Sequence, residues 1–271
     1  IGLLLTVATT VNAQSVTWIS STEGNVWQKS KVKLQSKSEQ NPVLQVDGTE
    51  NGVVFKNWGT TFNELCWDAL GLLTRTEQDE ILYNIFSPQG DLRITRGRIS
   101  MGANDYARSW YSCDEVEGDF ELRYFNINRD KQTIIPFIRA AQKYNPNLTF
   151  WISPWCPPSW MKINGDYPVL SSPFNSLSEK QNYLLYGATG GQVDENEMKL
   201  TDARDGVFPR QLATTDFMIQ DPRYLQTYAD YFCRFIDAYK EQGIPIDMVM
   251  YQNEAYSYTP YPGCAWTAAG T

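Results

Sequence analysis

Residues 248–255, Met-Val-Met-Tyr-Gln-Asn-Glu-Ala, place two chemically capable side chains at the end of a mainly apolar run. The run begins at Ile246 and gives way to Asn253 and Glu254, as a buried parallel strand does where its carboxyl end opens into a site. A carboxyl group there can protonate the leaving oxygen of a glycoside, and the neighbouring amide can hold a sugar hydroxyl. The other interpretation is a polar strand end that only caps the next loop, and the dipeptide alone does not separate the two.

The absence of histidine narrows the chemistry further. None of the 271 residues is His, so this chain holds no Ser-His-Asp triad, no Cys-His pair and no His-ligated zinc. Acid–base chemistry must therefore use carboxylates, Tyr, Lys or Cys. No metal-binding motif appears, and we predict neither a metal nor a cofactor.

Charge and composition indicate the kind of partner. The net charge is −8, the pI is about 4.7 and no basic stripe appears, so nucleic acid and anionic membrane surfaces are poor partners. Nine Trp and sixteen Tyr can pack a core, but their flat faces also stack on sugar rings. A carbohydrate partner is predicted, and the oligomeric state is left open. The five Cys are widely spaced and odd in number, which favours buried thiols over a disulfide framework.

The first 50 residues differ in texture from the rest. Residues 1–13 are apolar and end in Val-Asn-Ala, like the later part of a secretory signal peptide, and are too short for a membrane span. They predict a secreted, periplasmic or cell-surface protein; the other interpretation is an apolar terminal strand. Residues 14–50 alternate polar and apolar around Val16, Trp18 and 31–35, which predicts short antiparallel strands with turns at 41–42 and 47–48.

From residue 51 onward, strand and helix patterns alternate. Strands are predicted at 53–55, 92–101, 148–153 and 246–252, and helices at 62–73, 76–86 (capped by Thr76), 127–144 and 221–243. Strand ends rich in polar residues favour an α/β fold of the TIM (β/α)8 barrel type over a doubly wound sheet. A complete barrel takes roughly 250 residues, so the first half is predicted here, with later strands beyond Thr271. The polar segment 175–219 either shapes a substrate cleft or is an insertion without a role.

Four stretches at these strand ends carry a resemblance, and they occur in one order along the chain. Together they resemble glycoside hydrolase family 30, the glucosylceramidase-like enzymes, over most of the chain from about residue 53. The family packs a side β-sandwich domain onto its barrel, so the resemblance implies a signal remnant at 1–13, side-domain strands at 14–50 and the first half of a catalytic barrel at 51–271. The stretches are KNWGTTFNE at 56–64, RISMGAND at 98–105, ISPWCPPSWMK at 152–162 and YQNE at 251–254.

The resemblance implies a retaining β-glycosidase acting on β-glucosides or related hexosides such as glucans, fucosides or glucosylceramide. Glu254 matches the general acid/base, and Asn253 matches the residue that binds the sugar 2-hydroxyl. Arg98 matches an arginine that supports the catalytic carboxylates. The remaining matches are substrate-binding candidates: Asp105 and Trp155 in the first sugar subsite, with the Trp155 ring as a stacking face, and Trp58 in the loop expected after the first strand.

Two departures and one set of open assignments remain. The family nucleophile is a Glu on strand seven, expected beyond residue 271, so no acid of this chain, Glu64 included, is assigned to it, and the chain alone is expected to be inactive. Ala255 stands where many relatives have Pro. The aromatic loop after the YQNE stretch either lines the leaving-group side or packs on itself; its tyrosines are Tyr256, Tyr258 and Tyr261. The alternative function is a non-catalytic carbohydrate-binding or scaffold protein on the same fold.

Overall fold

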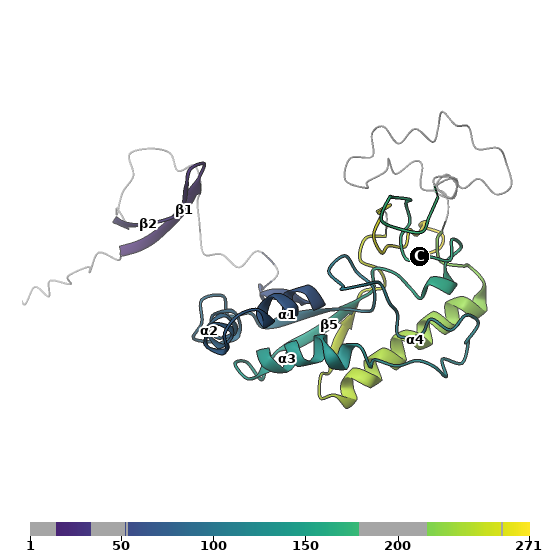
Figure 1. Cartoon of the computed structure of the whole chain (residues 1–271). Coiled ribbons are helices and arrows are strands. Elements are labelled where there is room, and N and C mark those ends of the chain that lie inside the picture. Colours follow the sequence, from purple (N-terminus) through teal and green to yellow (C-terminus); the bar gives the residue numbers. More distant parts are fainter. Residues whose placement is uncertain (1–14, 34–51, 53, 179–215, 256) are drawn as a thin grey trace, which may run out of the picture. The chain divides into compact units, whose positions relative to one another are not determined.

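The computed structural model describes residues 15–33, 52, 54–178, 216–255 and 257–271 (Figure 1). The chain divides into two units, residues 1–54 and residues 55–271. The predicted signal segment 1–13, the turns at 41–42 and 47–48, Tyr256 and most of the polar segment 175–219 lie outside the described residues. Among the described helices, none has the length and apolar character needed to cross a membrane.

A β-hairpin makes up most of the described part of the first unit. Strand β1 (Ser15–Thr22) pairs antiparallel with β2 (Asn25–Lys33), with Val16 opposite Val32 and Trp18 opposite Ser30. The turn between them uses Gly24 at φ +79°, a conformation that glycine adopts without strain. The predicted antiparallel strands are therefore present, while the larger side β-sandwich stays a prediction.

Four parallel strands form the sheet of the second unit. They are β3 (Gly59–Phe62), β4 (Arg96–Ser100), β5 (Thr149–Ser153) and β6 (Ile246–Val249), and they are neighbours in their order along the chain. A barrel has this sequential order, whereas a doubly wound sheet reverses its strand order near the middle. The described sheet thus has the strand order of an α/β barrel.

Helical segments connect each strand to the next (Figure 1). Between β3 and β4 lie α1 (Glu64–Gly71) and α2 (Arg75–Phe86), and between β4 and β5 lie the short η1 (Asp130–Gln132) and α3 (Ile134–Gln142). Between β5 and β6 lie η2 (Ser159–Met161) and the long α4 (Pro222–Glu241), which is capped by Asp221 as predicted. Such crossovers allow all strands to run in the same direction.

One face of the sheet packs against helices. Phe62, Ile99 and Ile152 lie in register on three neighbouring strands and are fully buried. The Phe62 ring lies 5.7 Å from the Phe86 ring of α2 and 4.7 Å from the Phe137 ring of α3. Side chains alternate between faces along a strand, so the register row of Thr61, Arg98 and Trp151 lies on the opposite face. Arg98 therefore points away from the helix layer.

Two sequence predictions need correction. The first barrel strand was expected at 53–55, but β3 is Gly59–Phe62, and Val54 and Phe55 are exposed coil. The apolar run is the stronger sequence signal, but only residues 59–62 pair with β4. The cap of α2 is Thr74 rather than Thr76, because Thr74 and Glu77 form a reciprocal capping box.

Candidate active site

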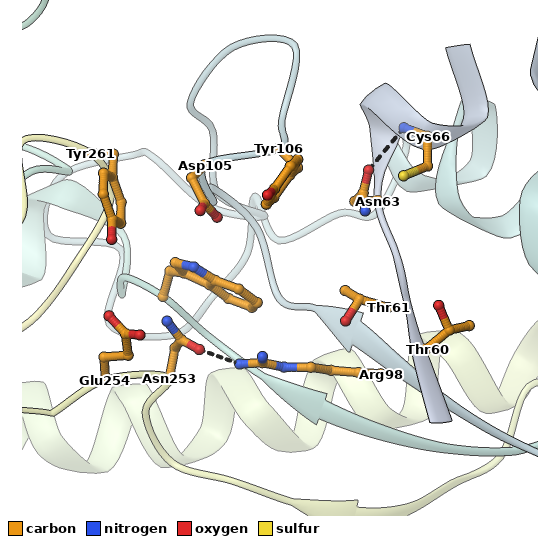
Figure 2. Close-up of a pocket in the computed structure, with 11 residues that line it drawn as sticks. Thr60, Thr61, Asn63, Cys66, Arg98, Asp105, Tyr106, Asn253, Glu254 and Tyr261 are labelled. Carbon is orange, nitrogen blue, oxygen red and sulfur yellow. Dashed lines mark hydrogen bonds between the residues drawn. The ribbon is translucent and has the colours of Figure 1, made fainter. Parts of the chain in front are cut away.

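A pocket of about 600 Å³ opens beyond the carboxyl ends of β3, β4, β5 and β6 (Figure 2). Parallel strands bring their carboxyl ends to one edge, so residues far apart in the sequence share one wall. The pocket is lined by Thr60, Thr61, Asn63, Cys66, Arg98, Asp105, Tyr106, Trp155, Asn253, Glu254 and Tyr261.

The pocket gathers five of the six predicted site residues: Glu254, Asn253, Arg98, Asp105 and Trp155. Trp58 is the exception. It precedes β3, and its carbonyl accepts hydrogen bonds from the amides of residues 95 and 96 at the start of β4. Because the strand starts after Trp58 instead of ending before it, this indole lies at the amino end of the sheet and is 63% exposed. The prediction that Trp58 contributes to the site conflicts with this position.

Arg98 of strand β4 forms a hydrogen bond with Asn253, in the polar segment that follows β6. Its Nη2 donates hydrogen bonds to the Asn253 side-chain oxygen and to Ser153 Oγ, the latter at 3.1 Å (Figure 2). Since the amide oxygen of Asn253 is engaged, its NH₂ group is the part available to donate to a ligand. This arrangement suits an amide that holds a hydroxyl oxygen.

The Arg98 guanidinium also stacks on an indole. It lies 4.1 Å from the centre of the Trp155 ring and 5.0 Å from that of Trp151. Trp155 is 7% exposed, so one ring face is covered by the cation and little of the ring is left for a ligand. Burial lowers the pKa of Arg98, and the charges of Asp105 and Glu254 oppose that shift.

Two carboxyl groups share this wall of the pocket. Figure 2 shows Glu254 beside Asn253, with Asp105 and Tyr261 on the neighbouring loops. Burial raises the pKa of the Asp105 carboxyl above its ordinary value, and the charge of Glu254 adds to this rise. Trp155 and Arg98 act in the opposite direction. The negative charge of Glu254 therefore disfavours ionisation of Asp105 in the same pocket.

Gln252 is a residue whose contribution the sequence did not reveal. It is 3% exposed, and its Nε2 donates to the Trp155 carbonyl at 2.7 Å. The Trp266 indole donates to its Oε1 at 3.3 Å, and the Asn253 amide donates to the Pro154 carbonyl at 2.8 Å. These bonds hold the segment after β6 against the segment after β5 and so fix the position of the Glu254 backbone. A buried amide within the YQNE stretch is the signal that could have indicated this.

The loop after β6 supplies one further pocket residue. Tyr261 lines the pocket, whereas Tyr258 is 2% exposed and belongs to the core. Tyr258 therefore fits the packing interpretation, and whether Tyr261 lines the leaving-group side stays a prediction. All five cysteines lie within the described residues and are free thiols; three are buried, and Cys66 is exposed at the pocket wall.

Fold and site together indicate the class of α/β-barrel proteins with a polar pocket at the carboxyl edge of the sheet. Here the pocket holds a carboxyl group, an amide and a stacked guanidinium. Residues 55–172 match a family described as the glycosyl hydrolase family 30 TIM-barrel domain. A Caenorhabditis elegans protein provisionally named glucosylceramidase 4 is 27% identical over 92% of this chain and 40% of its own length. The endo-1,6-β-D-glucanase neg1 of Aspergillus fumigatus is 26% identical over 83% of this chain and 40% of its own length.

Solved structures show the same fold. SrfJ from Salmonella typhimurium aligns with a TM-score of 0.61 at 17% identity, over 93% of this chain and 46% of that one. An endo-β1,6-glucanase aligns with a TM-score of 0.54 at 21% identity, over 79% of this chain and 38% of that one. Together, the domain match and the curated relatives support a member of glycoside hydrolase family 30. The chain spans 40% of the length of each of these two curated relatives.

Proposed function

We propose that this chain forms the acid/base half of a retaining β-glycosidase in which Glu254 is the general acid/base. The observation that supports this is the placement of Glu254 and Asn253 in the pocket at the carboxyl edge of the sheet, with Asn253 oriented by Arg98. Glycosidase barrels act at this edge because the loops there are free to surround a ligand. Asn253 then binds a hydroxyl of the sugar, and Asp105 contacts the same ring.

In this mechanism, Glu254 gives its proton to the glycosidic oxygen as the bond to the anomeric carbon breaks. A second carboxylate attacks that carbon and forms a glycosyl-enzyme. Glu254, now ionised, takes a proton from the water molecule that displaces the enzyme carboxylate. The β configuration is retained because the carbon is inverted twice. Retaining enzymes hold the two carboxyl groups about 5–5.5 Å apart.

The second carboxylate is proposed to come from a longer chain that includes these residues. Two features support this proposal. Nε of Arg98 is buried and has no hydrogen-bond partner within the described residues, so a further acceptor fits beside it. Strand β6 pairs only with β5 in the described sheet, and the apolar residues Met248 to Tyr251 are 41–46% exposed. A further strand would cover this edge, and the present residues alone should not turn over substrate.

The proposed substrates contain β-linked glucose. The names of the two relatives, glucosylceramidase and endo-1,6-β-D-glucanase, both refer to glucose-containing compounds. Related hexosides such as β-fucosides are also proposed as substrates. The polar side chains that line the pocket can bind hydroxyl groups that many sugars share. We further propose that the protein is exported, since residues 1–13 follow the pattern of a signal peptide.

The test is turnover of a panel of aryl β-glycosides by the full-length protein and by Glu254→Ala, with and without azide. Loss of general acid/base catalysis should lower the rate by about 10²–10⁴-fold. Azide should restore turnover and give a β-glycosyl azide, because a small anion can attack the glycosyl-enzyme without proton removal. Glu117→Ala, which removes an exposed carboxylate outside the pocket, is the matched control and should retain the wild-type rate.

Equal turnover by the wild type and Glu254→Ala would contradict the catalytic assignment. If neither protein hydrolyses any glycoside but both bind the sugar, the protein is a non-catalytic carbohydrate-binding or scaffold protein on this fold.

A further inference from the structure

The loop that carries Asp105 into the pocket has no helix or strand of its own. Residues 101–129 are all described, and they connect β4 to η1 through turns and bends alone. Such a segment owes its conformation to side-chain and turn contacts rather than to a ladder of backbone hydrogen bonds. The Tyr106 amide donates to Asn104 Oδ1 within the loop at 2.8 Å, and contacts from outside the loop add to this bond.

Glu64, the first residue of α1, makes these outside contacts. It is 0% exposed and does not line the pocket, although its neighbour Asn63 does. One carboxylate oxygen accepts a hydrogen bond from the Arg108 amide at 2.8 Å. The two oxygens accept from Arg129 Nε and Nη2 at 2.8 and 2.6 Å, which is a two-point ion pair. Burial raises the pKa of Glu64, but the hydrogen bonds from Arg129 and the Arg108 amide outweigh it, so the pKa is lowered.

Arg129 extends this anchor along the loop. Its Nη1 donates to Ser109 Oγ and its Nη2 to the Ser109 carbonyl, both at 2.9 Å. Its guanidinium also lies 4.0 Å from the centre of the Tyr111 ring. One residue beyond Glu64, the amide of Leu65 donates to the Tyr106 carbonyl at 3.2 Å. The start of α1 and Arg129 thus contact the segment 106–111, which directly follows Asp105.

We propose that Glu64 is a positioning residue that fixes the loop at 105–111, so that Asp105 and Tyr106 stand where the sugar binds. This inference rests on the proposed function for its effect on turnover. Glu64 touches no substrate; it acts through Arg108 and Arg129. Replacing it by Gln keeps the size of the side chain but removes the charge, which breaks the two-point pair with Arg129.

The first experiment measures amide hydrogen exchange over residues 102–111 in the full-length protein, comparing wild type with Glu64→Gln. The matched control is Asp68→Asn, which removes an exposed carboxylate that accepts two hydrogen bonds from the side chain of the same Arg108. Exchange should be about tenfold faster or more in Glu64→Gln and within about twofold of wild type in Asp68→Asn. Unchanged protection in Glu64→Gln would overturn the proposal.

The second experiment asks whether Glu64 acts through Asp105. With 4-nitrophenyl β-glucoside as the probe, Glu64→Gln should lower kcat/KM by about tenfold, mainly by raising KM, because the affected residues bind rather than transfer protons. In the Asp105→Asn background the same change should lower kcat/KM by less than about twofold, since the misplaced group is already missing. A purely structural residue would cost the same in both backgrounds, and that result would contradict positioning.

Failure of the proposed function is distinguishable from failure of this inference. If the wild type hydrolyses no aryl glycoside, the glycosidase proposal fails, while the exchange measurement still decides whether Glu64 orders the loop. If Glu64→Gln does not fold, Arg129→Lys replaces it in both experiments. That variant keeps the positive charge but loses the fork of donors, and it should show the same pattern with a smaller change.

Discussion

Asp130 is a buried carboxyl group, and within the described residues no cation forms an ion pair with it. It is 0% exposed, and its two oxygens accept hydrogen bonds from the hydroxyls of Tyr111 and Tyr239, each at 2.6 Å. Burial is the main reason that the pKa of Asp130 rises to about 6; the two tyrosines lower it and the charge of Glu64 raises it further. Between pH 3.8 and about pH 6, the folded protein therefore holds a proton on Asp130 that the unfolded chain has lost.

The sign and size of the effect follow from this difference. Between the ordinary pKa of 3.8 and the folded value of about 6, the native state binds one more proton than the unfolded state, so the free energy of unfolding falls as pH rises. Two pH units at 1.36 kcal/mol each amount to about 3 kcal/mol, of which about 2 kcal/mol lies between pH 4.5 and pH 7. Below pH 4.5 the lowered pKa of Glu64 acts in the opposite direction, because the free energy of unfolding that it contributes rises with pH.

Urea unfolding at pH 4.5 and pH 7 tests this reasoning with the wild type and Asp130→Asn. The amide copies the neutral carboxyl, accepting from one tyrosine and donating to the other. The variant should therefore lose about 2 kcal/mol less stability than the wild type over this range. Burial also raises the pKa of Asp114 to about 6. Asp114 therefore also makes the free energy of unfolding fall as pH rises, and it does so in both the wild type and Asp130→Asn.

Asp79→Asn is the control for this measurement. It also removes a carboxylate that accepts from a tyrosine, here Tyr144 at 2.8 Å, but its side chain is 43% exposed. Its pH dependence should follow that of the wild type. If Asp130→Asn does so too, the buried proton does not contribute to stability and the reasoning is wrong.

Two further changes probe packing and a buried cation, both by urea unfolding. Gly97→Ala should cost about 1–3 kcal/mol, because its Cβ would lie 2.5 Å from the Phe62 ring and 2.8 Å from the Phe150 ring; Gly71→Ala, with nothing within 4 Å, should cost nothing. Lys162→Met should cost about 3 kcal/mol, because the buried ammonium donates to three backbone carbonyl oxygens at 2.7–3.0 Å. A loss below about 0.5 kcal/mol would contradict the predicted clash at Gly97 or the predicted stabilisation by Lys162.

Sequence patterns located much of the fold because each signal was local. Asp221 before Pro222 and Gly243 after the apolar stripe define helix α4, and the structure agrees at both ends. The first barrel strand was misplaced because Gly59 to Phe62 includes two threonines and only one large apolar residue. Phe62 is part of a strand because Ile99 and the rings of α2 and α3 surround it, and no local pattern records those neighbours.

The candidate site, too, depends partly on the local sequence and partly on the tertiary structure. A chain without histidine that places Asn253 and Glu254 shortly after an apolar run offers a carboxyl group for acid–base chemistry there, whatever its detailed packing. That Arg98 orients Asn253 across 155 positions, and that Glu64 and Arg129 meet across 65, depends on how parallel strands and their crossovers bring distant segments together. These contacts are long-range hydrogen bonds between side chains, and they form only after the sheet has brought the strand ends to one edge.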